Sequence, residues 1–241
     1  MRKFFQGFAL AVNMLSIFPF FKVHDFFKGI NGFAVMFYPL VGLILGSVLA
    51  LLQYLLSGIF PDLHVSIMIL VLWVLFSGAL HLDGFSDTVD GLFVPKKRSF
   101  EVMKDPNVGA MGMVFSVVFL LLKASALLHV THWTQLALIL MLARYNAVLA
   151  IYFYPYLSKN GMGFLAKKEF TFKHLIFSTF SVIGVVLFTL NGWILLFVSI
   201  FAFLMMKIFF IRRYGGFSGD IYGFVIEMTE LILLHVIILN L

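Results

Sequence analysis

One short stretch, HLDGFSDTVDGLF, places several carboxylates close together in a chain that has few of them. Asp83, Asp87 and Asp90 fall within residues 81–93, whereas the whole chain of 241 residues contains only 11 acidic residues. On a helix these three positions are i, i+4 and i+7, and they therefore share one face. Neighbouring carboxylates about 6 Å apart repel each other by roughly 3 kcal/mol at an effective dielectric constant of about 20. A bound cation would relieve this repulsion, so the spacing predicts a metal site.

The ligand types in this stretch indicate which cation it would hold. The chain has no cysteine, which excludes thiolate metal sites, disulfides and cysteine nucleophiles. Carboxylates favour Mg²⁺, with Mn²⁺ as an alternative, over zinc, and Mg²⁺ commonly bridges a few carboxylates to the phosphates of a substrate. The competing interpretation is a helix end that aspartates merely solvate. Gly84 and Gly91, which would let a ligand approach the backbone, favour the metal site, and His81 is a weaker candidate for substrate binding.

A second acidic group lies near the C-terminus, in the segment GGFSGDIYGFVIEMTE. Asp220, Glu227 and Glu230 would fall within one sector of a helix, and Asp220 and Glu227 are further candidate metal ligands. Ionisable groups within a membrane span are costly and usually functional. Gly216 and Gly219 precede this helix, so a backbone loop that contacts phosphate is an alternative to a simple turn.

Several basic and polar residues also need partners. Arg144 and Lys123 lie in the middle of apolar segments, where a charged group must face the protein interior, a carboxylate or a ligand. Asn146 lies two residues after Arg144, and it either belongs to the same site or lies only on the same helix. Lys104 and Asp105, in MKDPNVGAMG, precede another apolar segment, where an exposed Asp-Pro turn is the alternative to a site.

The composition determines which elements must position these residues. The chain is 62% hydrophobic and 12% charged, with a mean hydropathy of +1.07, which lies outside the range of soluble proteins. We predict an all-α, polytopic membrane protein that forms a single domain over residues 1–241. A spanning helix needs about 20 apolar residues, and five to seven spans satisfy this; we predict seven, preceded by a retained N-terminal interfacial or re-entrant helix. The seven segments are 30–57, 64–82, 110–130, 133–156, 174–190, 192–211 and 221–240.

The distribution of basic residues gives an independent test of this topology. With the N-terminus in the cytoplasm, 14 of the 17 basic residues fall in segments on the inner side, as the positive-inside rule requires. The two longer inner loops are 83–109 and 157–173, and we expect the site on that side. The net charge of +6 reflects this topology and anionic lipid, or an anionic substrate, and we expect no nucleic-acid partner.

Four motifs in one order resemble a known family. HLDGFSDTVDGLF, EVMKDPNVGAMG, ARYNAVLAIYFYPY and GGFSGDIYGFVIEMTE extend over nearly the whole chain. They are similar to those of the cobalamin synthase family, the adenosylcobinamide-GDP ribazoletransferases. The resemblance implies a magnesium-dependent enzyme of the prokaryotic cytoplasmic (inner) membrane, acting late in vitamin B12 assembly. It would join adenosylcobinamide-GDP to α-ribazole or its 5′-phosphate and release GMP. One departure is Ser16 and Ile17, where the resemblance leads us to expect a Thr-Arg pair.

The resemblance assigns roles in phosphoryl transfer, which depends on positioning and charge neutralisation. Asp83, Asp87 and Asp90 would hold one or two Mg²⁺ ions against the diphosphate. Asp87 or Asp90 would also act as the general base for the attacking hydroxyl. Lys104 and Arg144 would offset charge on the pyrophosphate or on the leaving GMP. Further candidate metal ligands are Asp105, Asp220 and Glu227. The candidate substrate-binding residues are His81, Lys104, Arg144, Asn146, Gly216 and Gly219.

Two other functions remain open on the residues alone. DTVDG is half of the aspartate pattern of CDP-alcohol phosphotransferases, but basic residues at 96–98 follow it here instead of a second pair of aspartates. An ion-coupled transporter could use the ionisable residues within the spans as a relay. Against a transporter, the densest acidic cluster lies at the membrane edge and no inverted repeat is evident. A homo-oligomer is compatible with the sequence, which does not determine the oligomeric state.

Overall fold

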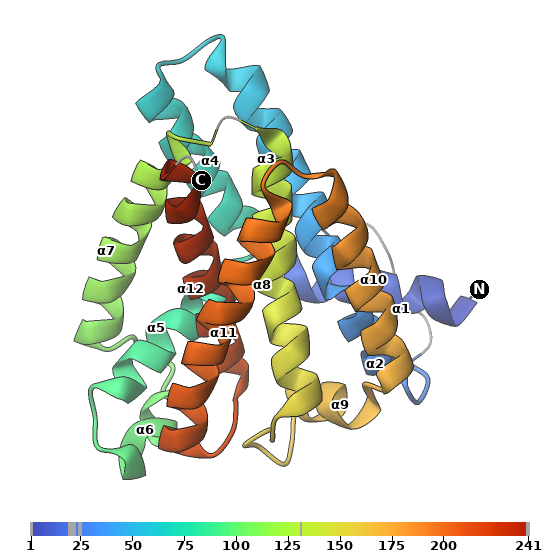
Figure 1. Cartoon of the computed structure of the whole chain (residues 1–241). Coiled ribbons are helices and arrows are strands. Elements are labelled where there is room, and N and C mark those ends of the chain that lie inside the picture. The colour runs from blue at the N-terminus through green and yellow to red at the C-terminus, as the bar shows by residue number, and fades with distance from the viewer. Residues whose placement is uncertain (1, 19–22, 24–25, 131, 240–241) are drawn as a thin grey trace.

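The computed structural model describes residues 2–18, 23, 26–130 and 132–239, and within these residues every regular element is a helix (Figure 1). The predicted all-α class is therefore confirmed. Tyr156 and Phe217 form an isolated parallel bridge between two connecting segments. The helices are α1 (Arg2–Leu15), α2 (Ile30–Met36), α3 (Tyr38–Ser57), α4 (Asp62–Phe76), α5 (Leu80–Leu92), α6 (Lys96–Val102), α7 (Ala110–Leu127), α8 (Trp133–Phe153), α9 (Met162–Glu169), α10 (Phe172–Phe188), α11 (Gly192–Tyr214) and α12 (Gly219–Ile238).

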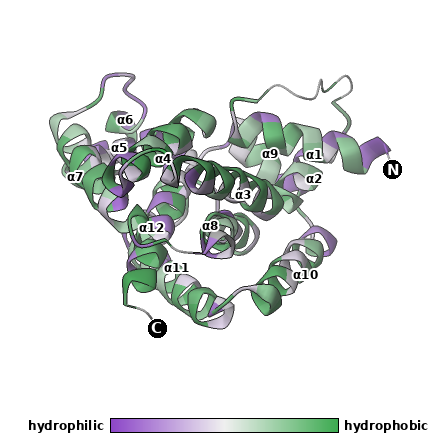
Figure 2. Cartoon of the chain, turned by 90° about the horizontal axis from the view of Figure 1, so that it is seen from above, coloured by the Kyte–Doolittle hydropathy of each residue, from purple (hydrophilic) through white to green (hydrophobic). Residues whose placement is uncertain are grey.

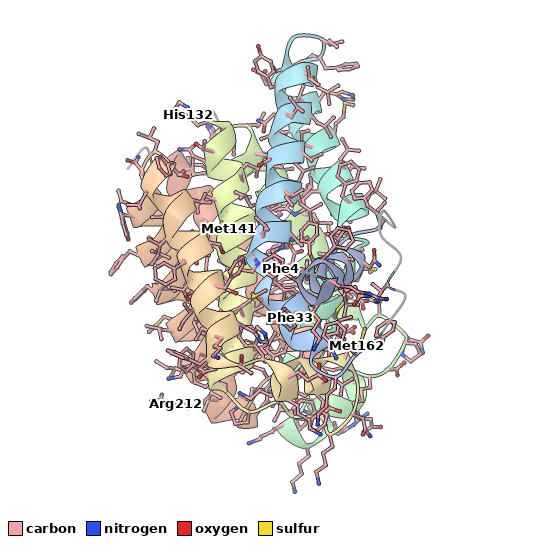
Figure 3. The ribbon with its side chains drawn as sticks, turned by 90° about the vertical axis from the view of Figure 1, so that its right-hand side faces the viewer. Phe4, Phe33, His132, Met141, Met162 and Arg212 are labelled. Atoms are coloured by element: carbon pink, nitrogen blue, oxygen red, sulfur yellow. The ribbon has the colours of Figure 1, made fainter. Side chains whose placement is uncertain are left out.

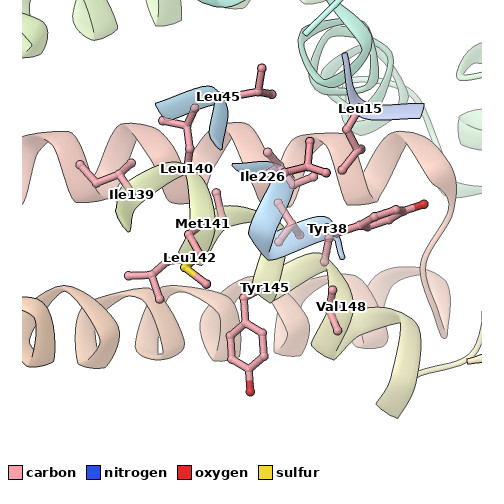
Figure 4. Packing of buried hydrophobic residues seen from close by; sticks show 14 of the residues in the cluster. Leu15, Tyr38, Leu45, Ile139, Leu140, Met141, Leu142, Tyr145, Val148 and Ile226 are labelled. Atoms are coloured by element: carbon pink, nitrogen blue, oxygen red, sulfur yellow. The ribbon is translucent and has the colours of Figure 1, made fainter. Parts of the chain in front are cut away.

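Helix α8 lies at the centre of the bundle, and the other long helices surround it (Figures 1 and 2). Every residue at positions 135–148 is buried, which explains why this helix is apolar on all sides. Gly42 and Gly46 let α3 approach α8, because a Cβ at Gly46 would lie 2.6 Å from Cα of Ala137. Leu140, Met141 and other α8 side chains fill the core on both sides of the helix (Figure 4).

Five of the described helices are long and apolar enough to cross a membrane, namely α3, α7, α8, α11 and α12. The number rises to seven if the bent pairs α4 with α5 and α9 with α10 each count as one span. Helices α7 and α11 expose large apolar side chains, such as Leu121 and Phe197, which suit lipid contact. The chain is therefore a multi-pass helical membrane protein.

Two of the predicted spans are interrupted in the structure, and the backbone conformation explains both interruptions. The predicted span 64–82 breaks after Phe76, because Gly78 and Ala79 adopt φ values of 63° and 55°, and α5 then leaves at 88° to α4. Helix α5 is therefore not a straight continuation of α4, and it is not among the five helices that are long and apolar enough to span a membrane by themselves. The predicted span 30–57 is interrupted at Phe37, because Pro39 in the first turn of α3 cannot donate a backbone hydrogen bond to a preceding turn.

The two ends of the bundle differ in charge. His132 lies at one end and Arg212 at the other (Figure 3). Helices α6 and α9 lie at the same end as Arg212 (Figure 1), and the basic residues 96–98 of α6 are exposed there. Helix α1, at 14 residues, is too short to span a membrane and runs across the bundle rather than along it (Figure 1).

Candidate active site

Helices α5 and α12 bring the two acidic motifs together. A Cβ at Gly84 would lie 2.9 Å from the backbone oxygen of Asp220, and a Cβ at Gly223 would lie 2.9 Å from the backbone oxygen of His81. Any larger residue would therefore separate the two helices. This close approach places Asp83 and Asp220 on the wall of the same cavity, although 137 positions separate them in the chain.

The three aspartates of the first motif lie on α5 at the predicted spacing, but their surroundings differ. Asp83 is exposed, Asp87 is half-buried and Asp90 is buried. Burial raises the pKa of Asp87 to about 7, and the negative charges of Asp83, Asp220 and Asp90 add to this effect. In the described chain, no ion pair involves Asp83, Asp87 or Asp220. This part of the protein therefore carries negative charge that no side-chain cation pairs with directly.

Asp90 is held by the start of α7. Its Oδ2 accepts a hydrogen bond from the Gly109 amide and its Oδ1 accepts one from the Gly112 amide, each at 2.8 Å. A Cβ at either glycine would collide with this carboxylate. The negative charge also lies favourably at the positive end of the α7 dipole. Asp90 thus fixes the start of α7 against α5, and its predicted roles as metal ligand and base stay predictions.

The second motif contains a buried ion-pair network. Lys123 Nζ on α7 lies 2.7 Å from Glu227 Oε2 and 2.5 Å from Glu230 Oε2, both on α12. Arg144 on α8 pairs with the other oxygen of Glu230. The four side chains are nearly inaccessible and contain two cations and two anions, so the network is electrically balanced. Glu227 has a protein partner, and its predicted role as metal ligand stays a prediction.

Arg144 connects this network to the first motif. Its Nη2 lies 3.5 Å from Nδ1 of His81 on α5. The pKa of His81 is held well below its usual value, first by burial and then by the charges of Arg144 and Lys123. The imidazole is therefore neutral, and its Nε2 has no hydrogen-bond partner in the described chain.

The other predicted site residues are distributed between the cavity, the surface and the core. Gly219 lines the cavity beside Asp220, and Lys104 is exposed within electrostatic reach of Asp220. Asp105 is exposed and accepts hydrogen bonds from Asn107 at 2.9 and 2.8 Å. The structure thus brings Asp83, Asp87 and Asp220 together and leaves Asp105 in a surface turn.

Two predicted substrate-binding residues lie in packed surroundings. Asn146 Nδ2 donates to Oγ of Ser199 and to Oγ1 of Thr229, each at 3.0 Å, and so ties α8 to α11 and α12. Gly216 packs under the backbone oxygen of Pro155 beside the Tyr156–Phe217 bridge. Their predicted contacts with substrate stay predictions.

Comparison with known protein families identifies the family of this chain. The model of the family described as cobalamin-5-phosphate synthase matches residues 7–238, which include all four motifs. The chain belongs to this family. The resemblance expected from the motifs is confirmed.

Several curated relatives of this cobalamin-5-phosphate synthase family member carry the name adenosylcobinamide-GDP ribazoletransferase. The relative from Desulforamulus reducens is 35% identical over 98% of this chain and 97% of its own length. The relative from Stutzerimonas stutzeri is 38% identical over 83% of this chain and 84% of its own, and that from Thermosynechococcus vestitus is 37% identical over 81% and 82%. No solved structure matches the chain.

The carboxylates of this family member fit a sparsely ligated divalent cation. Among the described residues, no three His, Asp or Glu side chains are close enough together to hold a metal ion by themselves. Mg²⁺ usually binds through one or two carboxylates and completes its shell with water and substrate phosphates. Asp83, Asp87 and Asp220, which carry unpaired charge beside a cavity, suit that mode of binding.

Sequence reasoning missed two tyrosines of the cavity, Tyr156 and Tyr222. Both belong to the quoted motifs of the family, and their rings stack with centroids 5.9 Å apart. The signal that could have identified them is an aromatic residue beside each glycine-rich or proline-containing turn. It is weak, because aromatic residues make up 17% of this chain.

Proposed function

We propose that this chain is an adenosylcobinamide-GDP ribazoletransferase that joins adenosylcobinamide-GDP to α-ribazole or its 5′-phosphate and releases GMP. The observation that carries the proposal is that Asp83 and Asp220 line one cavity, with Asp87 near enough to feel their charges, and that none of the three has an ion-pair partner in the described chain. A diphosphate is a substrate for which such a group of carboxylates would recruit a metal. The relatives carry this name over nearly the same length.

The reaction exchanges one phosphorus–oxygen bond for another. A hydroxyl oxygen of the ribazole bonds to the phosphorus on the cobinamide side, and the bond from that phosphorus to the bridging oxygen of GMP breaks. Mg²⁺, when bound, would neutralise the charge of the diphosphate and of the leaving GMP. Asp83 and Asp220 would hold it, and exposed Lys104 would add positive charge near Asp220.

The proton of the attacking hydroxyl needs an acceptor. Both oxygens of Asp90 already accept backbone hydrogen bonds from the start of α7. Asp87 is half-buried on the same face and has no such partner in the described chain. Of the two predicted bases, Asp87 is therefore the one we propose.

The proposed setting is the cytoplasmic membrane of a prokaryote, with the N-terminus, α6 and α9 on the cytoplasmic side. Support comes from the exposed basic residues at that end of the bundle. Because the chain has no cysteine, single cysteines can report its orientation. We expect an impermeant maleimide to label Gly58→Cys in spheroplasts and Lys97→Cys only after lysis; the reverse pattern would invert the topology.

The product assay tests the proposed reaction. Purified protein in liposomes is incubated with adenosylcobinamide-GDP, α-ribazole and Mg²⁺, and GMP and the joined corrinoid are separated by chromatography. We expect both products in equal amounts, and neither in the presence of EDTA. A folded protein that forms no product would contradict the proposal, and CDP-alcohol substrates and then transport by proteoliposomes would be tested next.

A further inference from the structure

The cavity beside the carboxylates has mostly apolar walls. It has a volume of about 220 Å³ and lies between α1, α3, α5, α8, α9 and α12. Its volume is below that of pockets that enclose drug-sized ligands, so it suits a compact group rather than a corrin macrocycle. Asp83, Gly219 and Asp220 give it one polar side. The apolar walls include Leu15, Tyr38, Ala147, Ile151, Ala166 and Ile226.

Two buried polar atoms lie in residues that line this cavity and have no partner in the described chain. They are Nε2 of His81 and Oη of Tyr222, whose residues are only 4% and 8% exposed. Buried polar groups in native proteins nearly always have a hydrogen-bond partner. Both orphans expose less than 1 Å² as the chain stands, so a ligand in the cavity would reach them only after a small movement of the cavity wall. Because the guanidinium of Arg144 can only donate, Nδ1 of His81 must accept, and Nε2 then carries the proton. His81 therefore offers a donor, and Tyr222 offers a hydroxyl.

The aromatic residues of the cavity favour a flat ligand. The Tyr156 and Tyr222 rings are stacked at an interplanar angle of 22°, and Phe217 continues the stack against Tyr222 with centroids 5.8 Å apart. Stacked rings stabilise planar aromatic groups through offset face contacts. A planar base thus matches both the aromatic wall and the small volume.

The structure assigns this cavity, we infer, to the fused bicyclic base of the α-ribazole acceptor. The inference rests on the proposed function and adds which substrate occupies which part of the site. The base of α-ribazole has no exocyclic polar groups, and its one unsubstituted ring nitrogen needs only a single donor, such as His81 or Tyr222. Guanine carries several hydrogen-bond donors and acceptors, and the two orphan atoms alone are too few to satisfy them. The sugar hydroxyls would then lie toward Asp83 and Asp220, where the diphosphate is proposed to bind.

Two substitutions and one matched control test the assignment. Ala166→Leu fills the cavity, and Tyr222→Phe removes only the orphan hydroxyl. Tyr145→Phe is the control, because Oη of Tyr145 lies 2.9 Å from Oγ1 of Thr179 and Tyr145 is not among the residues that line the cavity. Equilibrium dialysis measures binding of α-ribazole alone, and turnover gives a separate KM for α-ribazole and for adenosylcobinamide-GDP.

We expect the dissociation constant for α-ribazole to rise roughly tenfold or more in Ala166→Leu. In Tyr222→Phe we expect it to rise about three- to tenfold, because one hydrogen bond is lost. The KM for adenosylcobinamide-GDP and all values for Tyr145→Phe stay as in the wild type. Unchanged α-ribazole binding in both cavity variants, or a raised KM for adenosylcobinamide-GDP instead, would overturn the assignment. If Ala166→Leu does not fold, Tyr222→Phe decides alone.

The same experiment separates this inference from the proposed function. A wild-type protein that binds α-ribazole but forms no product would contradict the proposed reaction and leave the cavity assignment intact. An active wild-type protein whose α-ribazole KM is insensitive to both cavity substitutions would contradict the cavity assignment alone. Guanosine that competes with α-ribazole as well as unlabelled α-ribazole does would also contradict it.

Discussion

The two acidic motifs of this chain look alike in the sequence, because each places carboxylates on one face of a helix. In the structure, the carboxylates of the two motifs differ in burial and in their ion-pair partners. Glu227 and Glu230 on α12 are buried, and Lys123 and Arg144 match their charges. Asp83 and Asp87 on α5 are exposed or half-buried, and in the described chain neither forms an ion pair. Glu227 and Glu230 are therefore balanced by cations within the protein, whereas Asp83 and Asp87 are proposed to take a cation from outside.

This difference shows how to separate structural from functional carboxylates in a membrane protein. A charged residue within the membrane indicates a binding or catalytic site only when no side chain of opposite charge pairs with it. The α12 network instead joins α7, α8 and α12 across the core and positions His81 through Arg144. We therefore expect substitutions of Glu227 and Glu230 to act first on folding, and those of Asp83, Asp87 and Asp220 to act first on turnover.

The largest effect is expected from Glu230→Ala. It leaves Lys123 and Arg144 without one shared carboxylate in a buried setting, which typically costs about 3–5 kcal/mol of the free energy of unfolding. Thermal unfolding in detergent measures the change. The matched control is Glu101→Ala on α6, because the Arg98–Glu101 pair is 3.9 Å apart and exposed. Equal losses of unfolding free energy in both variants would show that the buried Glu230 pairs stabilise the protein no more than an exposed ion pair does.

The next effect is expected from Asp87→Asn. We expect the transfer rate to fall about 10²- to 10³-fold, the range seen when one electrostatic contact to a reacting group is removed. The free energy of unfolding should stay the same or rise, because one of several mutually repelling carboxylates is lost. The measurement pairs initial rates of GMP release with thermal unfolding. A destabilised but fully active variant would reverse the roles assigned to the two motifs.

A smaller effect is expected from Asp90→Ala. Loss of the carboxylate leaves the Gly109 and Gly112 amides without their partner, and removal of a helix cap typically costs about 0.5–2 kcal/mol. Hydrogen exchange at the first turn of α7, compared with its last turn, measures the local effect. Protection that is unchanged at the first turn would contradict the role of Asp90 in fixing α7.

The sequence predicted the helical class, the apolar segments and the aspartate stripe of α5, because each of these depends on residues near one another in the chain. It did not predict the break before α5, since Ala79 adopts a positive φ that nothing about alanine indicates. It also did not predict the partner of Glu227, because Lys123 lies 104 residues away and only the packing of α7 against α12 joins them. The cavity, with walls from six helices, is a tertiary feature of the same kind.

The most direct test compares Asp220→Asn with Glu227→Gln, two substitutions on the same helix at positions that the sequence alone predicted to bind metal. The quantity measured is the Mg²⁺ concentration that gives half of the maximal transfer rate, which does not depend on how much of the protein remains folded. We expect this concentration to rise at least about tenfold, the equivalent of roughly 1.4 kcal/mol, in Asp220→Asn and to stay at the wild-type value in Glu227→Gln. A wild-type value in Asp220→Asn together with a raised value in Glu227→Gln would contradict the division between aspartates that bind metal and glutamates that pair within the protein.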